Sequence, residues 1–306
     1  MKNFECWLLK TIFASGDKKR LKKDVVPQNV TVLFSNENYF EDGKKRHNFD
    51  VIVPKGREDE KLPAIINIHG GGFCAGTKEI YDNYARRMAA EGFVVININY
   101  SLAPKYPFPH AIEDCVQAIN YCLSNKEKYH MADEYFVMGD SAGANLAATM
   151  GLIATNPEYA ELMGLKINER MTGIYLSCGC YTLVNQNEDG KKSPIELDVM
   201  YFQKKRENFP DKRKYEILES VTKDFPPTFI TSCSDDFLYK DNVAMKEKLD
   251  ALGVKNVALF FDSSHEPLGH VFNYRYISDE GKVFPEAEEA KKVSTEFFKT
   301  LSERSE

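Results

Sequence analysis

The residues with the clearest chemical potential lie at positions 139–143, which read Gly-Asp-Ser-Ala-Gly and match the pattern G-x-S-x-G. The apolar segment 135–138 before them is typical of a strand, and segment 142–154, rich in Ala and Leu and free of Pro, is typical of a helix. In a strand–turn–helix context this pattern forms a nucleophile elbow, in which the serine stands above the end of the sheet. The sequence therefore predicts Ser141 as a nucleophile at a helix N-terminus, where the helix dipole favours a developing anion.

A serine nucleophile needs partners, because its hydroxyl reacts poorly at neutral pH without an adjacent base. A histidine takes the proton, and a carboxylate orients that histidine and stabilises its charged form. On this kind of elbow the chain order is Ser, then Asp or Glu, then His. Two acids follow the predicted strand 228–232 and two histidines follow the predicted strand 257–261, namely Asp235, Asp236, His265 and His270. Loops at the carboxyl ends of parallel strands share one rim of a sheet, so all four can approach the elbow.

A glycine-rich stretch at positions 69–72, His-Gly-Gly-Gly, follows the predicted strand 64–68. Acyl transfer passes through an oxyanion, and each backbone N–H group directed at it contributes about 3 kcal/mol. Glycines let the backbone approach a substrate closely, and a loop placed upstream of the elbow can supply such donors. A phosphate-binding loop is the alternative, but the stretch has neither a G-K-[ST] ending nor a G-x-G-x-x-G register.

The elements that must position these residues alternate between strands and helices, which predicts an α/β fold with a mostly parallel sheet. About eight strands are expected, near residues 30–34, 49–53, 64–68, 93–98, 135–138, 173–177, 228–232 and 257–261. The first two are joined by a turn short enough for an antiparallel hairpin. Helical spacing predicts helices near residues 81–92, 112–119, 142–154, 245–252 and 290–301. Three prolines within residues 102–109 predict an extended loop there.

Length and composition indicate one soluble domain over residues 1–306, with 43% hydrophobic and 28% charged residues. The net charge of −6 argues against a nucleic-acid partner. Seven cysteines without C-x-x-C spacing indicate reduced packing residues in a reducing, cytoplasmic compartment. Cys178 and Cys180 lack neighbouring His or Cys partners for a zinc site. No run is long enough to span a membrane, and no stable membrane anchor is expected.

Two regions depart from the regular alternation. Residues 7–13 are apolar, but Glu5 and Lys10 interrupt the run, so we expect a short amphipathic helix there and not a signal peptide. Residues 185–214 are polar and charged between two predicted strands, which indicates an insertion into the sheet domain.

Several ordered motifs resemble the hormone-sensitive-lipase family of α/β-hydrolase esterases. They are HGGGF at 69–73, YSLAP at 100–104 with PFP at 107–109, GDSAG at 139–143, DFL at 236–238 and GHVF at 269–272. Each motif alone is weak, whereas their joint occurrence in this order is specific. The resemblance covers roughly residues 62–300. The sequence departs from the family pattern at Ser101, where Arg is usual, and at Phe237, where Pro is usual.

The resemblance implies a role for each motif residue. The nucleophile, acid and base are Ser141, Asp236 and His270, and the oxyanion donors are the N–H groups of Gly71, Gly72 and Ala142. Asp236 is preferred to Asp235 because it occupies the D-x-L position, and His270 is preferred to His265 because of its G-H-x-F context. His69 is expected to brace the glycine loop, and Asp140 to belong to the architecture of the elbow.

The resemblance further implies a serine carboxylesterase for small esters with a short acyl chain, working without a metal or an organic cofactor. A small cap built from about residues 1–45 and 185–214 is expected to cover the site, with Trp7, Tyr201 and Phe202 as candidate lining residues. Alternatives are a deacetylase of acetylated sugars, an amide or peptide hydrolase, and a small-molecule receptor on the same fold. A homodimer through the edge of the last strand is a further expectation.

Overall fold

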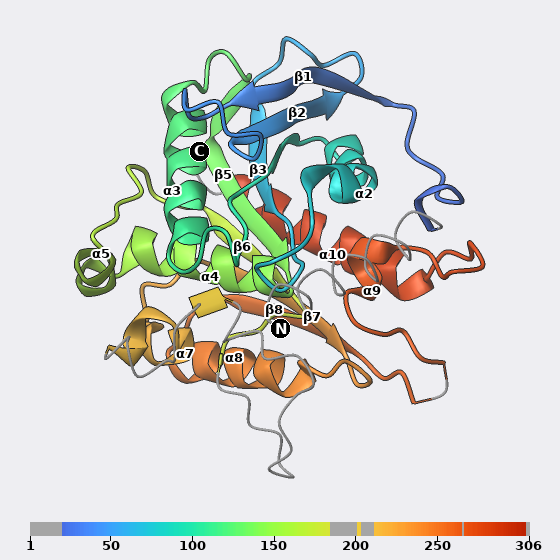
Figure 1. Ribbon diagram of the computed structural model, residues 1–306. Coiled ribbons are helices and arrows are strands. Elements are labelled where there is room, and N and C mark those ends of the chain that lie inside the picture. The colour runs from blue at the N-terminus through green and yellow to red at the C-terminus, as the bar shows by residue number, and fades with distance from the viewer. Residues whose placement is uncertain (1–19, 184–200, 203–210, 265, 304–306) are drawn as a thin grey trace.

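The computed structural model describes residues 20–183, 201–202, 211–264 and 266–303. A single sheet of eight strands runs through its centre in the order β1-β2-β4-β3-β5-β6-β7-β8 (Figure 1). The strands are β1 Val30–Asn38, β2 Asn48–Pro54, β3 Leu62–Ile68, β4 Val94–Ile98, β5 Met131–Asp140, β6 Gly173–Ser177, β7 Thr228–Cys233 and β8 Asn256–Phe261. β2 pairs antiparallel with both β1 and β4, and all other pairs are parallel. The predicted eight-stranded, mostly parallel sheet with an N-terminal hairpin is confirmed.

Helices cover both faces of the sheet. The longer ones are α2 Lys78–Ala90, α3 His110–Ser124, α4 Ala142–Thr155, α8 Tyr239–Ala251 and α10 Pro285–Ser302, and the shorter ones are α5 Pro157–Met163, η2 Lys212–Lys214, α7 Ile217–Ser220 and α9 Phe272–Arg275. The five helices predicted from helical spacing are present. The short helices are not predicted because three to seven residues are too few to show helical spacing. For α5 the sequence does contain a local signal, which is Asn156 followed by Pro157. Asn156 caps the helix by accepting a hydrogen bond from the Tyr159 N–H at 3.1 Å.

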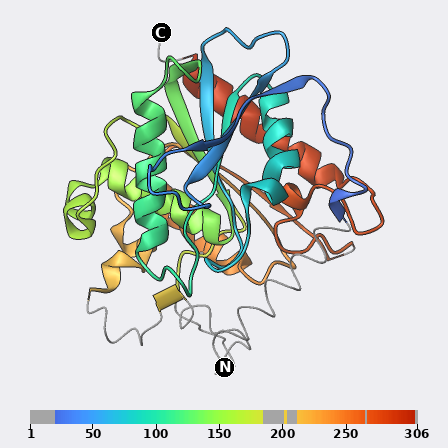
Figure 2. The ribbon, with the colours of Figure 1, turned by 45° about the horizontal axis from the view of Figure 1, so that its top comes forward.

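Alternate side chains of each central strand enter different layers. Ile66 packs with residues of α3 and α4, such as Ile119 and Leu146. Its neighbour Ile65 packs on the opposite face with residues of α2 and α10, such as Met88 and Phe298. Figure 2 shows α3 and α4 on one side of the sheet and α2 and α10 on the other. Because both faces are covered, β3 and β4 can be apolar runs that only Asn67 and Asn97 interrupt.

The structure narrows the expected cap. Residues 30–38 of the expected cap form strand β1 and therefore belong to the sheet. Residues 1–19, 184–200 and 203–210 lie outside the described part, and so do the amphipathic helix and Trp7. Tyr201 and Phe202 are described and buried, and the Tyr201 ring stacks on Phe73 with 3.9 Å between centroids. The insertion thus contacts the end of the glycine loop.

Other sequence predictions can be compared directly with the structure. Residues 102–109 contain no strand or helix, as their prolines predict. The six described cysteines are free, and all except half-buried Cys180 are buried, which confirms their packing role. Among the described residues, no helix combines the length and apolar character that crossing a bilayer requires.

Candidate active site

Ser141 occupies a sharp turn between β5 and α4, as the elbow prediction requires. Its φ of +52° lies in the left-handed region, which is rare for a residue other than glycine and stores strain. The two flanking glycines are sterically required. A Cβ on Gly143 would lie 2.2 Å from the Ile68 carbonyl oxygen, and a Cβ on Gly139 would lie 2.3 Å from that of Gly143. The close packing of β3, β5 and α4 thus fixes where Ser141 sits.

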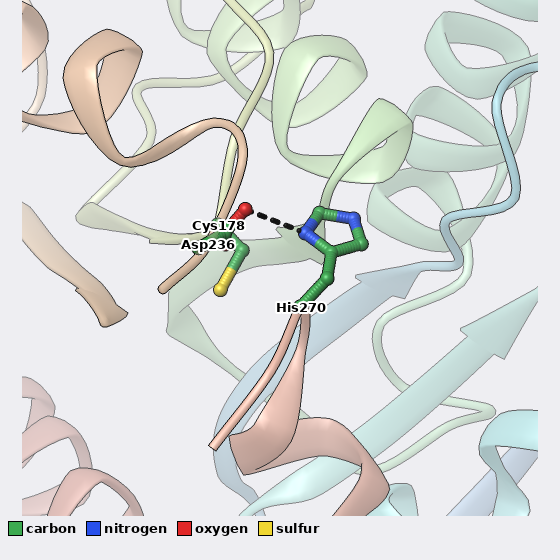
Figure 3. A group of neighbouring side chains, drawn as sticks. All are labelled: Cys178, Asp236 and His270. Carbon is green, nitrogen blue, oxygen red and sulfur yellow. Dashed lines mark hydrogen bonds and ion pairs between the residues drawn. The ribbon is translucent and has the colours of Figure 1, made fainter. Parts of the chain in front are cut away.

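An acid–histidine pair lies on the loops that follow β7 and β8. His270 Nδ1 and Asp236 Oδ1 are 3.0 Å apart (Figure 3). The Asp236 side chain is fully buried, whereas 24% of the His270 side chain is exposed. Burial alone would raise the pKa of Asp236, but the hydrogen bond and charge of His270, the Cys178 thiol and the Leu238 N–H group hold it below its usual value. Asp236 is therefore ionised at neutral pH and can orient a His270 ring that carries its proton on Nδ1.

Asp235, the other candidate acid, has a different position. Its carboxylate accepts the Gly269 N–H at 2.9 Å and the hydroxyl of Ser263. It therefore links the loop after β7 to the loop that carries His270. The structure brings Asp236 into contact with His270 and gives Asp235 a bracing position. His265 lies outside the described residues.

The elbow and the acid–histidine pair meet at one rim of the sheet, where β5, β6 and β7 end. The Ser141 N–H group donates to the carbonyl of Ser177 at 2.9 Å. The next residue, Cys178, places its sulfur within 4.8 Å of the Asp236 and His270 ligand atoms. Within the described part of the chain, no hydrogen bond joins the Ser141 hydroxyl to His270. Such bonds are often long in a site without substrate and tighten when substrate binds.

The glycine loop contains backbone N–H groups that, among the described residues, have no protein acceptor. Gly71 and Gly72 have φ values of +111° and +59°, and the Gly71 carbonyl turns back to accept the N–H groups of Cys74 and Ala75. Among the described residues, the N–H groups of Gly71, Gly72 and Ala142 donate to no protein acceptor. Unpaired donors beside a nucleophile can bind an oxyanion.

His69 braces this loop, as predicted. Its Nδ1 lies 2.7 Å from the Gly70 carbonyl oxygen, and its ring stacks on Tyr100 with 4.2 Å between centroids. Complete burial lowers the pKa of His69 to about 3, so the ring is neutral. A neutral ring fixed in this way supports the loop and does not transfer protons at neutral pH.

Asp140 joins the glycine loop to the elbow. One carboxylate oxygen accepts the Gly70 N–H at 2.8 Å, and the other accepts the Tyr81 hydroxyl at 2.8 Å. Burial raises the pKa of Asp140 to about 7, although the hydrogen bond from Tyr81, the charge of His270 and the Gly70 N–H group favour ionisation. The sequence pattern predicts that Asp140 belongs to the elbow, but it gives no sign of the contact with Tyr81, because only the fold brings α2 to this point.

We expect Asp140→Asn to remove a pH dependence of stability. The folded-state pKa of about 7 exceeds the ordinary 3.8, so between these values the folded protein holds a proton that the unfolded chain has released. The contribution of Asp140 is therefore complete below about pH 4 and is lost as pH rises through about 7. Its size is a few kcal/mol, since one pKa unit corresponds to about 1.4 kcal/mol. Asparagine mimics the protonated acid and does not titrate.

Urea unfolding of both proteins across this pH range measures the effect. The stability of the wild type relative to Asp140→Asn should fall as pH rises from about 4 to about 7. A constant difference between wild type and Asp140→Asn would contradict the buried-acid interpretation.

Comparisons with known proteins agree with the fold. The family described as the alpha/beta hydrolase fold matches residues 65–267, and the chain belongs to this family. An alpha/beta hydrolase of Acanthamoeba polyphaga mimivirus is 29% identical over 220 residues, covering 69% of this chain and 62% of the viral protein. Hormone-sensitive lipase of Bos taurus is 40% identical over 94 residues, covering 29% of this chain and 12% of the lipase. Both matches span less than two thirds of the relative.

Esterase B from Lactobacillus rhamnosis has a similar structure, with a TM-score of 0.87 and 22% identity over 99% of this chain and 97% of that one. At this identity the likeness concerns the fold. Together with the family match and the relatives, it confirms the α/β-hydrolase fold and the resemblance to hormone-sensitive lipase inferred from the motifs.

Proposed function

We propose that the chain is a serine carboxylesterase acting on small esters with a short acyl chain. The observation that carries this proposal is the 3.0 Å hydrogen bond between buried Asp236 and partly exposed His270, on the same rim as Ser141, whose backbone is held in the strained turn of an elbow. An esterase-type hydrolase is also what the family and its lipase and esterase relatives support.

In the proposed reaction, His270 Nε2 takes the hydroxyl proton as Ser141 attacks the ester carbonyl. The developing oxyanion is bound by the N–H groups of Gly71, Gly72 and Ala142. The alcohol leaves with the proton from His270, and water then hydrolyses the acyl-enzyme by the same route. Ionised Asp236 stabilises the imidazolium that forms in both steps. No metal or organic cofactor enters the scheme.

The acyl-chain preference comes from the family resemblance. Tyr201 stacked on Phe73 supports the idea that part of the insertion lines the site beside the glycine loop. The proposed cap consists of about residues 1–45, apart from strand β1, and of about residues 185–214. Deacetylation of sugars and hydrolysis of amides remain alternatives that use the same groups. A non-catalytic receptor ranks below them, because Ser141, Asp236 and His270 are all present.

A fluorophosphonate probe and a series of p-nitrophenyl esters from acetate to decanoate test this function. An esterase should be labelled at Ser141 and should hydrolyse the short esters fastest. Fastest hydrolysis of the long-chain esters would support the esterase assignment but refute the short-chain preference. Absence of both labelling and hydrolysis would refute the enzyme and favour the receptor.

Phe237, at the position where the family motif has Pro, is a candidate for selecting the alcohol part of the ester. It is 73% exposed, and its ring lies 4.5 Å from the His270 ring, centroid to centroid. Because the alcohol takes its proton from His270, it leaves beside this ring. Phe237→Ala should lower kcat/KM for phenyl acetate by roughly 2- to 10-fold, since an aromatic pair contributes about 0.5–1.5 kcal/mol.

The same variant should change kcat/KM for ethyl acetate by less than about twofold, because an alkyl alcohol makes no ring pair. Phe40→Ala, which removes an aromatic ring that is 40% exposed and packs against His47, serves as the control. Equal losses for the aryl and alkyl esters would show that Phe237 acts on the geometry of His270 and does not select the alcohol.

Partners and compartment are also proposals. β8 forms one edge of the sheet, so a second copy could pair along it as a homodimer. The free described thiols support a reducing, cytoplasmic compartment. The small ester is the proposed ligand, and the negative net charge argues against nucleic acid.

A further inference from the structure

Three side chains able to bind a metal ion converge where β6, β7 and β8 end. Cys178, Asp236 and His270 each offer one ligand atom, and these atoms all lie within 4.8 Å of one another. Cys178 and Asp236 are buried, and His270 is partly exposed. Figure 3 shows the sulfur and the carboxylate on the side of the imidazole ring that carries Nδ1, with the second ring nitrogen pointing away. Apart from Cys180, the residues near Cys178 in the sequence include no such ligands, whereas the fold brings Asp236 and His270 to it.

The donor set matches a thiophilic divalent cation. A thiolate, an imidazole nitrogen and a carboxylate oxygen are the ligands of Zn²⁺, which binds them at about 2.0–2.3 Å in a tetrahedron. Such bonds place ligand atoms roughly 3.5 Å apart. Nδ1 and Oδ1 are already 3.0 Å apart, and the sulfur, which lies within 4.8 Å of both, has to move by no more than about 1.3 Å to reach this spacing. The fourth position would hold water.

We propose that Cys178, Asp236 and His270 form a binding site for Zn²⁺ or Cd²⁺, and that the metal-bound protein is inactive as an esterase. The inhibitory part rests on the proposed function, because two members of the cluster are the proposed acid and base. The binding part rests on the cluster alone. The two roles exclude each other, since one nitrogen cannot bind a metal and donate to Asp236 at once.

The proton balance explains the inhibition. The metal binds the sulfur as thiolate, so the thiol proton is released to solvent. It also binds the Nδ1 lone pair, so the ring proton moves from Nδ1 to Nε2. A neutral imidazole with its proton on Nε2 cannot accept the proton of the Ser141 hydroxyl. The metal therefore blocks general-base catalysis without contacting the serine.

Two neighbouring thiols provide matched controls. Cys233 Sγ lies 3.4 Å from the Gly269 carbonyl oxygen, and Cys180 Sγ lies 3.6 Å from that of Thr182. Among the described residues neither belongs to the ligand cluster. Their replacement changes the thiol count of the same region by one while leaving the three ligands intact.

The first experiment needs no catalysis. The full chain carrying Ser141→Ala, without a histidine tag, is titrated with Cd²⁺ while the thiolate-to-cadmium absorption in the ultraviolet is recorded. We expect one equivalent to bind. Adding Cys178→Ser should abolish that absorption, and adding Cys233→Ser should leave it. Cys178→Ala is a second variant, and thermal melts show which proteins are folded. Equal thiolate-to-cadmium absorption with and without Cys178, or loss of this absorption in Cys233→Ser, would refute the proposed metal site.

The second experiment follows ester hydrolysis in the presence of Zn²⁺. The wild type should be inhibited and should recover with EDTA, and Cys178→Ser should need at least about 10-fold more Zn²⁺, because even an outer-shell partner is worth 10- to 100-fold in affinity. Inhibition unchanged in Cys178→Ser would overturn the inhibitory role. Cadmium binding by a protein that hydrolyses no ester would uphold the site and refute the proposed function. Ester hydrolysis by a protein that shows no Cys178-dependent cadmium binding would refute the metal site and uphold the proposed function.

Discussion

Replacing Ser141 by alanine is expected to lower kcat for ester hydrolysis by roughly 10⁶-fold, the loss typical of removing the nucleophile of a serine hydrolase. The acyl group then has no oxygen to bind covalently, and only the oxyanion donors and substrate binding remain. His270→Ala should cause a similar loss, because an unactivated hydroxyl is a poor nucleophile. The two losses should not add in the double variant, since both residues serve one step. Stopped assays with p-nitrophenyl acetate at high enzyme concentration measure these residual rates.

Ser294→Ala is the matched control for a buried serine. The Ser294 hydroxyl donates to the Lys291 carbonyl oxygen at 2.9 Å within α10, away from the rim that carries Ser141. Its loss should affect stability by about 1 kcal/mol and leave kcat unchanged. Retention of more than about one hundredth of the wild-type rate by Ser141→Ala would contradict the nucleophile assignment, once contaminating esterase is excluded by the absence of fluorophosphonate labelling.

The strands and the turn that position this site can be predicted from the sequence, because they depend on the residue types of short continuous segments. β3 and β4 are apolar runs that only a sheet covered on both faces can bury. The glycines at 139 and 143 have no room for a Cβ, so the elbow leaves a signature in the sequence itself. The short helices α7 and α9 left no such signature, because their four residues each depend on tertiary packing.

The choice between Asp235 and Asp236 shows where sequence reasoning ends. Both are aspartates that follow β7, and only the D-x-L motif separated them. In the structure the difference arises from contacts with a distant loop, where Ser263 and Gly269 bind one carboxylate and His270 binds the other. The clustering of Cys178 with Asp236 and His270 has the same origin, because it depends on three strands ending side by side.

Replacing Asp236 by asparagine is expected to lower kcat by roughly 10⁴-fold, the effect of the same change in a serine protease triad. Asp236 Oδ1 accepts both the His270 Nδ1–H at 3.0 Å and the Leu238 N–H at 2.8 Å. In either orientation the amide carries no charge, and where its NH₂ group takes the Oδ1 position it donates to Nδ1 and favours the ring tautomer with the proton on Nε2. That tautomer cannot take the Ser141 proton, and the imidazolium also loses its counter-charge.

Asp235→Asn is the matched comparison, because it makes the same chemical change one residue earlier. The variant weakens the contacts to Gly269 and Ser263 that hold the loop, but His270 keeps its bond to Asp236. Its kcat should fall by about 10-fold or less, as expected for a change of about 1 kcal/mol in a hydrogen bond to a charged group. Steady-state rates of both variants, measured with thermal melts to confirm folding, make the comparison. Equal losses in two folded proteins would mean that charge near the rim, and not contact with Nδ1, determines the rate.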